Sequence, residues 1–357
     1  MNVSFVSLGC DKNRVNTEQM MALCLQAGIT VQEDCPGSDV VVINTCGFID
    51  SAKSEAIDTI LSAAQLKDAG EIQKILVTGC LSQRYQADIL EELPEIDGIM
   101  GTGCFGDIVP ALEQVMNGQE CRHFADINGP VEELPRVLST PRHYAYLRIA
   151  EGCSNRCAYC VIPSLRGNYR SRRMEDILAE ARALADDGVR ECIVIAQDIT
   201  RYGMDLYGER KLPELLRALC RLPFHWIRLH YLYPDNLSDE LIDTIAGEEK
   251  ICNYLDIPIQ HCNDAVLKAM PAGRPRRGWR PCLPGCGTAS QAWCCAPASS
   301  PACPMRTRPP SRSCAAFWGS RSSSGWGPLP TPRRRAPLRR RCSTGWTPRR
   351  PSAGRSW

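Results

Sequence analysis

Three cysteines in one short segment are the residues of this chain best suited to chemistry. Residues 151–160 read EGCSNRCAYC, so Cys153, Cys157 and Cys160 have the spacing Cys-x3-Cys-x2-Cys. Zinc ribbons and fingers complete a tetrahedron from two pairs of ligands. Three thiolates can instead hold three corners of a [4Fe–4S] cluster and leave one iron open. An open iron can take part in a reaction rather than only carry electrons.

Two other interpretations of this loop exist. Three cysteines can fall this close together by chance in a chain with 21 cysteines, and a distant fourth ligand could complete a zinc site. We favour the cluster because other cysteines support it. The strand-like run YAYLRIA at 144–150 also places the loop at the carboxyl end of a strand, where parallel α/β folds have their active sites.

A second set of three cysteines follows three predicted strands in the first part of the chain. The sequences LGC, NTC and TGC place Cys10, Cys46 and Cys80 just beyond these strands, 36 and 34 residues apart. Because parallel strands share one carboxyl edge, we expect the three thiols to converge and to hold a second [4Fe–4S] cluster. The alternative is that they are ordinary buried cysteines.

Short apolar runs that alternate with helical periodicity predict an α/β fold with a parallel sheet. In an N-terminal domain at 1–125 we expect strands at 3–8, 39–43 and 74–77 and helices around 18–23, 56–61 and 85–93. After a linker at 126–143, we expect strands at 144–150, 191–196, 226–231 and 254–257 and helices at 174–187, 211–222 and 239–247. The four units at 144–270 predict the first part of a (βα) barrel, without its later units.

The composition changes sharply after Met270. Residues 271–357 contain 17 arginines and none of the 40 acidic residues, so the net charge of +2 combines −15 before residue 271 with +17 after it. Asp, Glu, Lys, His, Asn, Tyr, Ile and Val are absent, and no apolar period remains. We predict an irregular or disordered, Arg/Pro-rich tail that comes from a shifted reading frame. A genuine basic RNA-binding tail is the alternative.

The sequence also restricts the cellular location. The first residues, MNVSFVSLGCDKN, lack the basic start and apolar core of a signal peptide, and no stretch approaches the ~18 apolar residues of a membrane helix. We therefore expect a cytoplasmic protein without membrane contact. Its cysteines should be reduced, which favours metal or cluster binding over disulfides.

These motifs resemble a known family. The cysteine loop with Tyr159 before its last cysteine resembles the radical S-adenosylmethionine superfamily, and the N-terminal domain with three strand-end cysteines resembles its methylthiotransferases, most closely the RimO type. The resemblance covers 1–270 and stops there. It rests on SLGCDKNRVNTE (7–18), NTCGFIDSAKSEAIDTI (44–60), TGCLSQRY (78–85), EGCSNRCAYCVIPSLRGNYRSR (151–172), QDITRYG (197–203), RLHYLYPDN (228–236) and YLDIPIQHCNDAVLKAM (254–270).

The resemblance implies a mechanism. The open iron of the cluster on Cys153, Cys157 and Cys160 would chelate S-adenosylmethionine, and one electron would cleave it to a 5′-deoxyadenosyl radical. That radical would remove hydrogen from the β-carbon of an aspartate, which no side-chain base could do near pH 7. The second cluster would supply or carry sulfur. A further S-adenosylmethionine would provide the methyl group of the methylthio product.

The resemblance also implies partners. The substrate would be a small-subunit ribosomal protein, and the electron would come from a low-potential donor such as flavodoxin or ferredoxin. The sequence does not decide whether the protein contacts RNA, because the sister group of this family modifies adenosine in tRNA. A third hypothesis is a non-catalytic iron–sulfur fragment with a basic RNA-binding tail.

Other residues have open roles. Tyr159 either packs along the adenine of S-adenosylmethionine or packs only against other side chains of the protein. Gln197 and Asp198 end the second barrel strand, a position that favours contact with cofactor. His230 and His261 lie at or beyond later strand ends, and we interpret them as structural rather than substrate contacts. Four arginines either offset acidic cofactor groups or form a solvated charged face: Arg166, Arg170, Arg172 and Arg173.

The chain departs from the family in its tail. The resemblance implies further barrel strands and then a small β-barrel domain, called TRAM, and neither can be found in 271–357. Both sets of cysteines precede the break, so cluster binding is expected to persist. An incomplete barrel exposes strand edges and apolar faces. We therefore expect the chain as written to be impaired as an enzyme.

Overall fold

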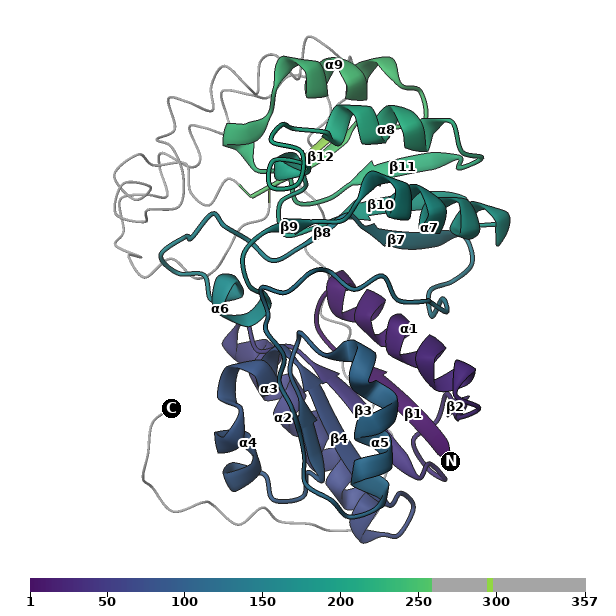
Figure 1. The fold of residues 1–357 in the computed structure, drawn as a ribbon, viewed down its shortest axis with the longest axis vertical. Helices are drawn as coiled ribbons and strands as arrows, with labels where there is room; N and C mark the ends of the chain where they lie inside the picture. Colours follow the sequence, from purple (N-terminus) through teal and green to yellow (C-terminus); the bar gives the residue numbers. More distant parts are fainter. Residues whose placement is uncertain (259–293, 298–357) are drawn as a thin grey trace, which may run out of the picture.

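The computed structural model describes residues 1–258 and 294–297, which form two α/β lobes (Figure 1). The first lobe ends with the strand at Cys121–His123, and the second begins with the strand at Tyr144–Arg148. Between them, residues 124–143 contain no helix or strand, as predicted for a linker. None of the helices in the described part combines the length and apolarity that crossing a membrane would need.

The first lobe is built on a six-stranded, fully parallel sheet with the strand order β2-β1-β3-β4-β5-β6. Its strands are β1 (Asn2–Ser7), β2 (Thr30–Gln32), β3 (Val40–Thr45), β4 (Lys74–Gly79), β5 (Gly98–Met100) and β6 (Cys121–His123). Its helices are α1 (Asp11–Gln26), α2 (Asp50–Asp68), α3 (Cys80–Tyr85), α4 (Ala87–Glu92) and α5 (Ile108–Met116), with a 3-10 turn η1 at Phe105–Asp107.

Every residue of β3 is buried, because this central strand has a hydrophobic core on each of its faces. Val40 and Val42 pack with residues of α1 and α5, whereas Val41 and Ile43 pack with residues of α2. The long apolar run at this strand is typical of a parallel sheet covered on both sides. This arrangement puts the loops that follow β1, β3 and β4 at one edge of the sheet.

The second lobe has a parallel sheet of three strands in the order β11-β10-β7. Its strands are β7 (Tyr144–Arg148), β10 (Glu191–Ile195) and β11 (Trp226–Leu229), and β12 (Tyr254–Ile257) follows as the next strand of the barrel. A short antiparallel pair, β8 (Ala150–Glu151) and β9 (Arg170–Ser171), brackets the helix α6 (Ile162–Arg166). The remaining elements are α7 (Met174–Asp186), η2 (Ile199–Arg201), α8 (Leu212–Cys220), η3 (Pro234–Asn236) and α9 (Asp239–Gly247).

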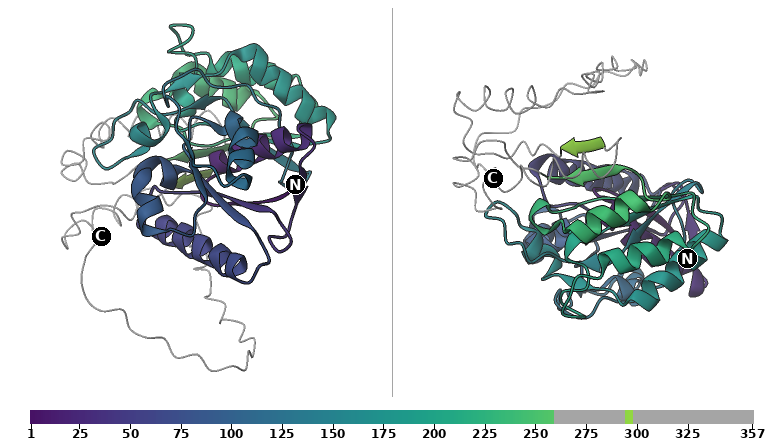
Figure 2. Two further views of the ribbon diagram at one scale, coloured as in Figure 1. Left: turned by 60° about the horizontal axis from the view of Figure 1, so that its bottom comes forward. Right: turned by 90° about the horizontal axis from the view of Figure 1, so that it is seen from above.

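The helices α8 and α9 lie on the side of this sheet away from the first lobe (Figures 1 and 2). One hydrophobic core runs through the lobe and includes Leu147, Val194 and Leu229 from the three paired strands. The four strands and three helices predicted from the sequence are all present, within a few residues at their ends. The prediction of an α/β fold with a parallel sheet and barrel units is therefore confirmed.

Most of the predicted tail lies outside the described residues, as does His261. The exception is β13 (Cys294–Pro297), which pairs in parallel with β12. The short strands β2, β5 and β6 and the helix α5 were absent from the prediction. Three-residue strands are too short to show an alternating pattern, and their place in the sheet depends on the longer strands beside them.

Candidate active site between the two lobes

The loops after β1, β3 and β4 bring the first three cysteines to one edge of the sheet. Cys10 is the N-cap of α1, Cys46 follows β3, and Cys80 begins α3. Burial raises the pKa of the Cys46 thiol, and the neighbouring thiols of Cys80 and Cys10 raise it further. Gly9, next to Cys10, lies against Cys46, and Gly47, next to Cys46, lies against the backbone of Cys80. The loops that carry the three cysteines are therefore neighbours at this edge.

Gly9 lets the chain turn closely around this site. Its φ is +83°, in the left-handed region that favours glycine. A Cβ atom at this position would lie 2.6 Å from the Cβ of Cys46, nearer than real Cβ atoms approach. Any larger residue would therefore displace Cys46.

The second set of cysteines lies in the loop between β8 and α6. Cys153 is buried, while Cys157 and Cys160 are half-buried. The backbone N–H of Cys160 donates to the carbonyl of Cys157 at 3.0 Å, and that of Cys153 donates to the carbonyl of Gly167 at 3.0 Å. Burial raises the pKa of Cys153 to about 11, and Asp198, Cys160 and Cys157 also raise it. This loop thus gathers its three thiols on the side of the lobe next to α6.

Both sets consist of three thiols, the donors that iron–sulfur clusters take. In residues 1–258, every cysteine is a free thiol. Across the described part of the chain, no three His, Cys, Asp or Glu side chains draw together as ligands of one metal ion would. A [4Fe–4S] cluster takes one thiolate on each of several separated irons, so its ligands lie farther apart than those of zinc.

Asp198 holds the second cysteine loop in place. Its carboxylate is buried and accepts from Asn155 Nδ2 at 2.9 Å and from the backbone N–H of Thr200 at 3.0 Å. Burial raises the pKa of Asp198, although these hydrogen bonds oppose the shift. Because Asn155 lies between Cys153 and Cys157, Asp198 positions the loop through its hydrogen bond to Asn155.

Three other predicted residues, Tyr159, Gln197 and His230, have defined neighbours in the structure. The hydroxyl of Tyr159 lies near the thiol of Cys157, and burial raises the pKa of the tyrosine. Gln197 Nε2 donates to Glu151 Oε1 at 2.9 Å, while its Oε1 is buried with no partner. The ring of His230 packs against Tyr231 and Tyr254, in line with a structural role.

The four arginines after the loop do not share one solvated face. Arg173 is exposed and pairs with Asp176, but Arg172 is buried against Glu133 and Glu180. Arg170 is half-buried and donates to the carbonyl of Gly129 at 2.9 Å. Arg166 is buried at the interface between the lobes. A solvated face is therefore wrong for Arg166 and Arg172, whose charges are neutralised inside the protein.

Comparison with known proteins places the chain in a family. Residues 2–101 match the model of "Uncharacterized protein family UPF0004", and residues 147–279 match that of the "Radical SAM superfamily". Over 272 residues the chain is 47% identical to the ribosomal protein uS12 methylthiotransferase RimO of Lachnoclostridium phytofermentans and 48% identical to that of Clostridioides difficile. Over 278 residues it is 48% identical to RimO of Caldanaerobacter subterraneus subsp. tengcongensis. Over its aligned part, the chain is similar to the RimO-type methylthiotransferases.

The match spans only part of the length of the RimO proteins. It covers 76–77% of this chain but only 61–64% of the RimO proteins. Among solved structures, the radical S-adenosylmethionine methyltransferase TsrM of Kitasatospora setae, with tryptophan and a S-adenosylmethionine analogue bound, matches with a TM-score of 0.64. It is 14% identical, and the match covers 89% of this chain and 71% of TsrM. The cobalamin-dependent radical enzyme OxsB matches with a TM-score of 0.51 at 12% identity, over 78% and 46% of the two chains. At these identities the likeness shows the fold alone.

The helix α1 contributes polar residues to the interface that sequence reasoning missed. Its side chains are buried although many are polar, because the helix lies between the sheet of the first lobe and β7 of the second (Figure 1). Lys12 Nζ lies 3.1 Å from the ring centre of Tyr231, and Glu18 pairs with Arg136. The buried polar residues of α1 are Lys12, Asn13, Asn16, Thr17, Glu18 and Gln19. The available signal was a helix with no apolar stripe, which is unusual for a helix on a parallel sheet.

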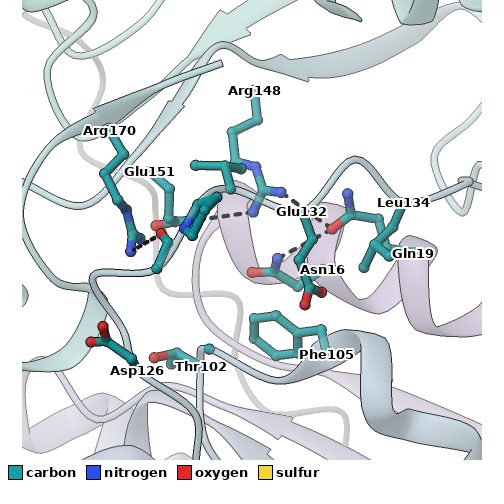
Figure 3. Close-up of a pocket in the computed structure, with 14 residues that line it drawn as sticks. Asn16, Gln19, Thr102, Phe105, Asp126, Glu132, Leu134, Arg148, Glu151 and Arg170 are labelled. Atoms are coloured by element: carbon teal, nitrogen blue, oxygen red, sulfur yellow. Dashed lines mark hydrogen bonds and ion pairs between the residues drawn. The ribbon is translucent and has the colours of Figure 1, made fainter. Parts of the chain in front are cut away.

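A small cavity of about 50 Å³ lies beside this interface. Figure 3 shows Arg148 and Glu151 of the second lobe facing Asn16 and Gln19 of α1. Arg148 donates to Glu151 Oε2 at 2.8 Å and to Gln19 Oε1 at 3.3 Å. Glu151 also accepts from Arg166 and Gln197, and it precedes Cys153 by two residues. Glu151 is therefore the point at which the second cysteine loop is tied to the first lobe.

Proposed function

We propose that the protein transfers a methylthio group to the β-carbon of an aspartate in ribosomal protein uS12. The proposal draws on the relatives, which carry the name of a uS12 methylthiotransferase. The observation that carries it is the pair of three-cysteine sites, one on each lobe, tied together by buried polar contacts at one interface. A reaction that needs both a radical and a sulfur donor has a use for two such sites.

Each set of cysteines has a separate role in this proposal. Cys153, Cys157 and Cys160 would hold a [4Fe–4S] cluster whose open iron binds S-adenosylmethionine. Cys10, Cys46 and Cys80 would hold the cluster that handles sulfur. When bound, these groups supply the radical and sulfur chemistry that no side chain of the protein can perform.

The protein's own residues bind and orient these groups. Gly9 lets Cys46 approach α1, and Asp198 fixes the loop of Cys153 and Cys157 through Asn155. Tyr159 lies beside Cys157, where its ring can pack against S-adenosylmethionine. The burial of Cys80 and Cys153 keeps water away from the reacting groups.

The proposal includes a location and partners. A cytoplasmic protein meets its ribosomal substrate and keeps its thiols reduced. A low-potential electron donor such as flavodoxin or ferredoxin would supply the electron, and the basic residues after 271 leave contact with RNA as a further proposal.

The test is an anaerobic assay with S-adenosylmethionine, a reductant and uS12, with full-length RimO of Lachnoclostridium phytofermentans as positive control. We expect 5′-deoxyadenosine from the chain as written, at a lower rate than from the control, and a methylthio adduct on uS12 by mass spectrometry. Cys153→Ala should lose both products, whereas Cys80→Ala should keep the cleavage and lose the adduct.

A parallel reaction with tRNA separates the proposal from its alternatives. A methylthio adduct on tRNA adenosine, with unmodified uS12, would contradict the proposed substrate. No cleavage of S-adenosylmethionine by a chain that holds iron would favour a non-catalytic iron–sulfur protein instead.

A further inference from the structure

Arg166 belongs to the second lobe but reaches into the first. It ends α6, the helix that follows the second cysteine loop, and α6 packs against α3, which begins with Cys80 (Figure 1). Its side chain is 3% exposed. The guanidinium donates to Asn13 Oδ1 at 2.5 Å and to Asn16 Oδ1 at 3.3 Å, both on α1. It also donates to both oxygens of Glu151, at 3.0 and 3.1 Å.

The same guanidinium lies beside the thiols of the first cysteine site. Asn13 Oδ1, which accepts from Arg166, is 4.0 Å from the sulfur of Cys80. Burial lowers the pKa of Arg166, but the carboxylate of Glu151 raises it by more, and Cys80 and Cys10 raise it further. A cation from the second lobe is thus built into the sulfur site of the first.

Arg166 shares its paired carboxylate with another buried cation. Arg148 and Arg166 are both buried, and in residues 1–258 the ion pairs that either makes are to Glu151 alone. The charge of Glu180 also acts on Arg148, whereas the other side chains that accept from Arg166 are neutral amides of α1. A buried cation is costly in a protein interior unless an anion lies close by. Cys80 of the first cysteine site lies on the other side of one of these amides, that of Asn13.

We propose that Arg166 is a positioning residue of the first cysteine site, where its charge offsets that of the cluster on Cys10, Cys46 and Cys80. This inference rests on the proposed function, because it assumes that these cysteines hold an anionic group. The guanidinium fork suits the task, since it binds Glu151 with one edge and Asn13 with the other. The first site is therefore completed by the second lobe, and its properties depend on how the lobes are joined.

The test isolates the first site in the full chain by changing Cys153, Cys157 and Cys160 to Ala. This triple Cys→Ala variant is the parent for the comparison, and after anaerobic reconstitution it should hold about four irons. Adding Arg166→Gln should release iron to a chelator about 10- to 100-fold faster, as expected when a group supporting metal ligands is lost. It should also lower the midpoint potential of the cluster, because a reduced cluster gains negative charge that a nearby cation stabilises.

Two variants separate charge from structure. Arg166→Lys keeps the positive charge and should keep the potential near that of the parent. Arg173→Gln removes an exposed arginine and should leave the iron content and the potential unchanged.

The outcomes distinguish the two proposals. A parent that binds no iron contradicts the proposed function. A parent with about four irons whose potential and iron release are the same with Arg166→Gln contradicts the role of Arg166. If circular dichroism shows that Arg166→Gln does not fold, the parent is compared with Arg166→Lys instead. A large drop in potential with the charge retained then contradicts the proposal, and an unchanged potential supports it.

Discussion

At the scale of single residues, the first cysteine site depends on Gly9 as much as on its sulfur ligands. The positive φ of Gly9 turns the chain from β1 into α1, and its missing Cβ leaves the space that Cys46 occupies. Gly28, at the other end of α1, has a similar φ of +77° but open space around it. The two glycines therefore separate the cost of the backbone conformation from the cost of the close approach.

We predict that Gly28→Ala destabilises the protein by about 1–2 kcal/mol, the cost of a left-handed alanine. Gly9→Ala should cost more and should also halve the iron content after reconstitution, because Cys46 must move. Urea denaturation and iron analysis of both variants check this. Equal iron content in the two variants would mean that the approach of Gly9 to Cys46 does not shape the site.

Residue type and spacing predict both sets of cysteines, whereas the charged residues around them have no such pattern in the sequence. Cys10, Cys46 and Cys80 end strands of one parallel sheet, so strand periodicity predicts that they converge. Arg166 meets Asn13 and Asn16 from about 150 positions away in the chain. No local pattern encodes such a contact, because it depends on how the lobes pack.

At the scale of elements, a chain of buried ion pairs joins the linker, α1 and α7. Arg136 pairs with Glu18 and Glu180, and Arg172 pairs with Glu180 and Glu133. Burial raises the pKa of Glu180, but Arg172 and Arg136 lower it by more, so its pKa lies below the ordinary value of 4.5. A carboxylate with a lowered pKa stabilises the folded state above its unfolded pKa, and this contribution disappears as the pH falls through the lowered value.

We predict that Glu180→Gln lowers the free energy of unfolding by roughly 1–3 kcal/mol at pH 7, because Arg136 and Arg172 each lose a carboxylate but keep another. The difference from the parent should shrink as the pH falls below about 4.5, where the unfolded carboxylate is protonated. Urea denaturation across this range measures it. Glu113→Gln, on the exposed side of α5, is the matched control and should stay within about 0.5 kcal/mol. A pH-independent difference for Glu180→Gln would show that its charge does not matter.

At the scale of the whole molecule, buried polar contacts of Arg166 with Asn13 and Glu151 join the two lobes beside Cys80. The helix α1 lies across that interface with its polar residues buried, which explains why its sequence shows no apolar stripe. The elements up to Ile257 agree with the strand–helix alternation read from the sequence. The irregular tail at 271–357 stays a prediction, because apart from β13 these residues lie outside the described part.

The reading-frame prediction has a direct check in the gene. Translation of the other two forward frames beyond codon 270 should reveal a continuing β/α pattern, with acidic residues and lysine restored. If neither frame shows such a pattern, the frameshift is wrong and the Arg-rich tail has to be explained as written.

The central claim is that the chain holds two separate clusters, and counting iron tests it most directly. The full chain should bind about eight irons after anaerobic reconstitution, and each triple Cys→Ala variant, at Cys10, Cys46 and Cys80 or at Cys153, Cys157 and Cys160, about four. A third variant changes Cys24, Cys104 and Cys121, which are buried in the first lobe away from the site, and should keep about eight. A full chain with four irons or fewer, or a site variant that keeps about eight, would contradict the account.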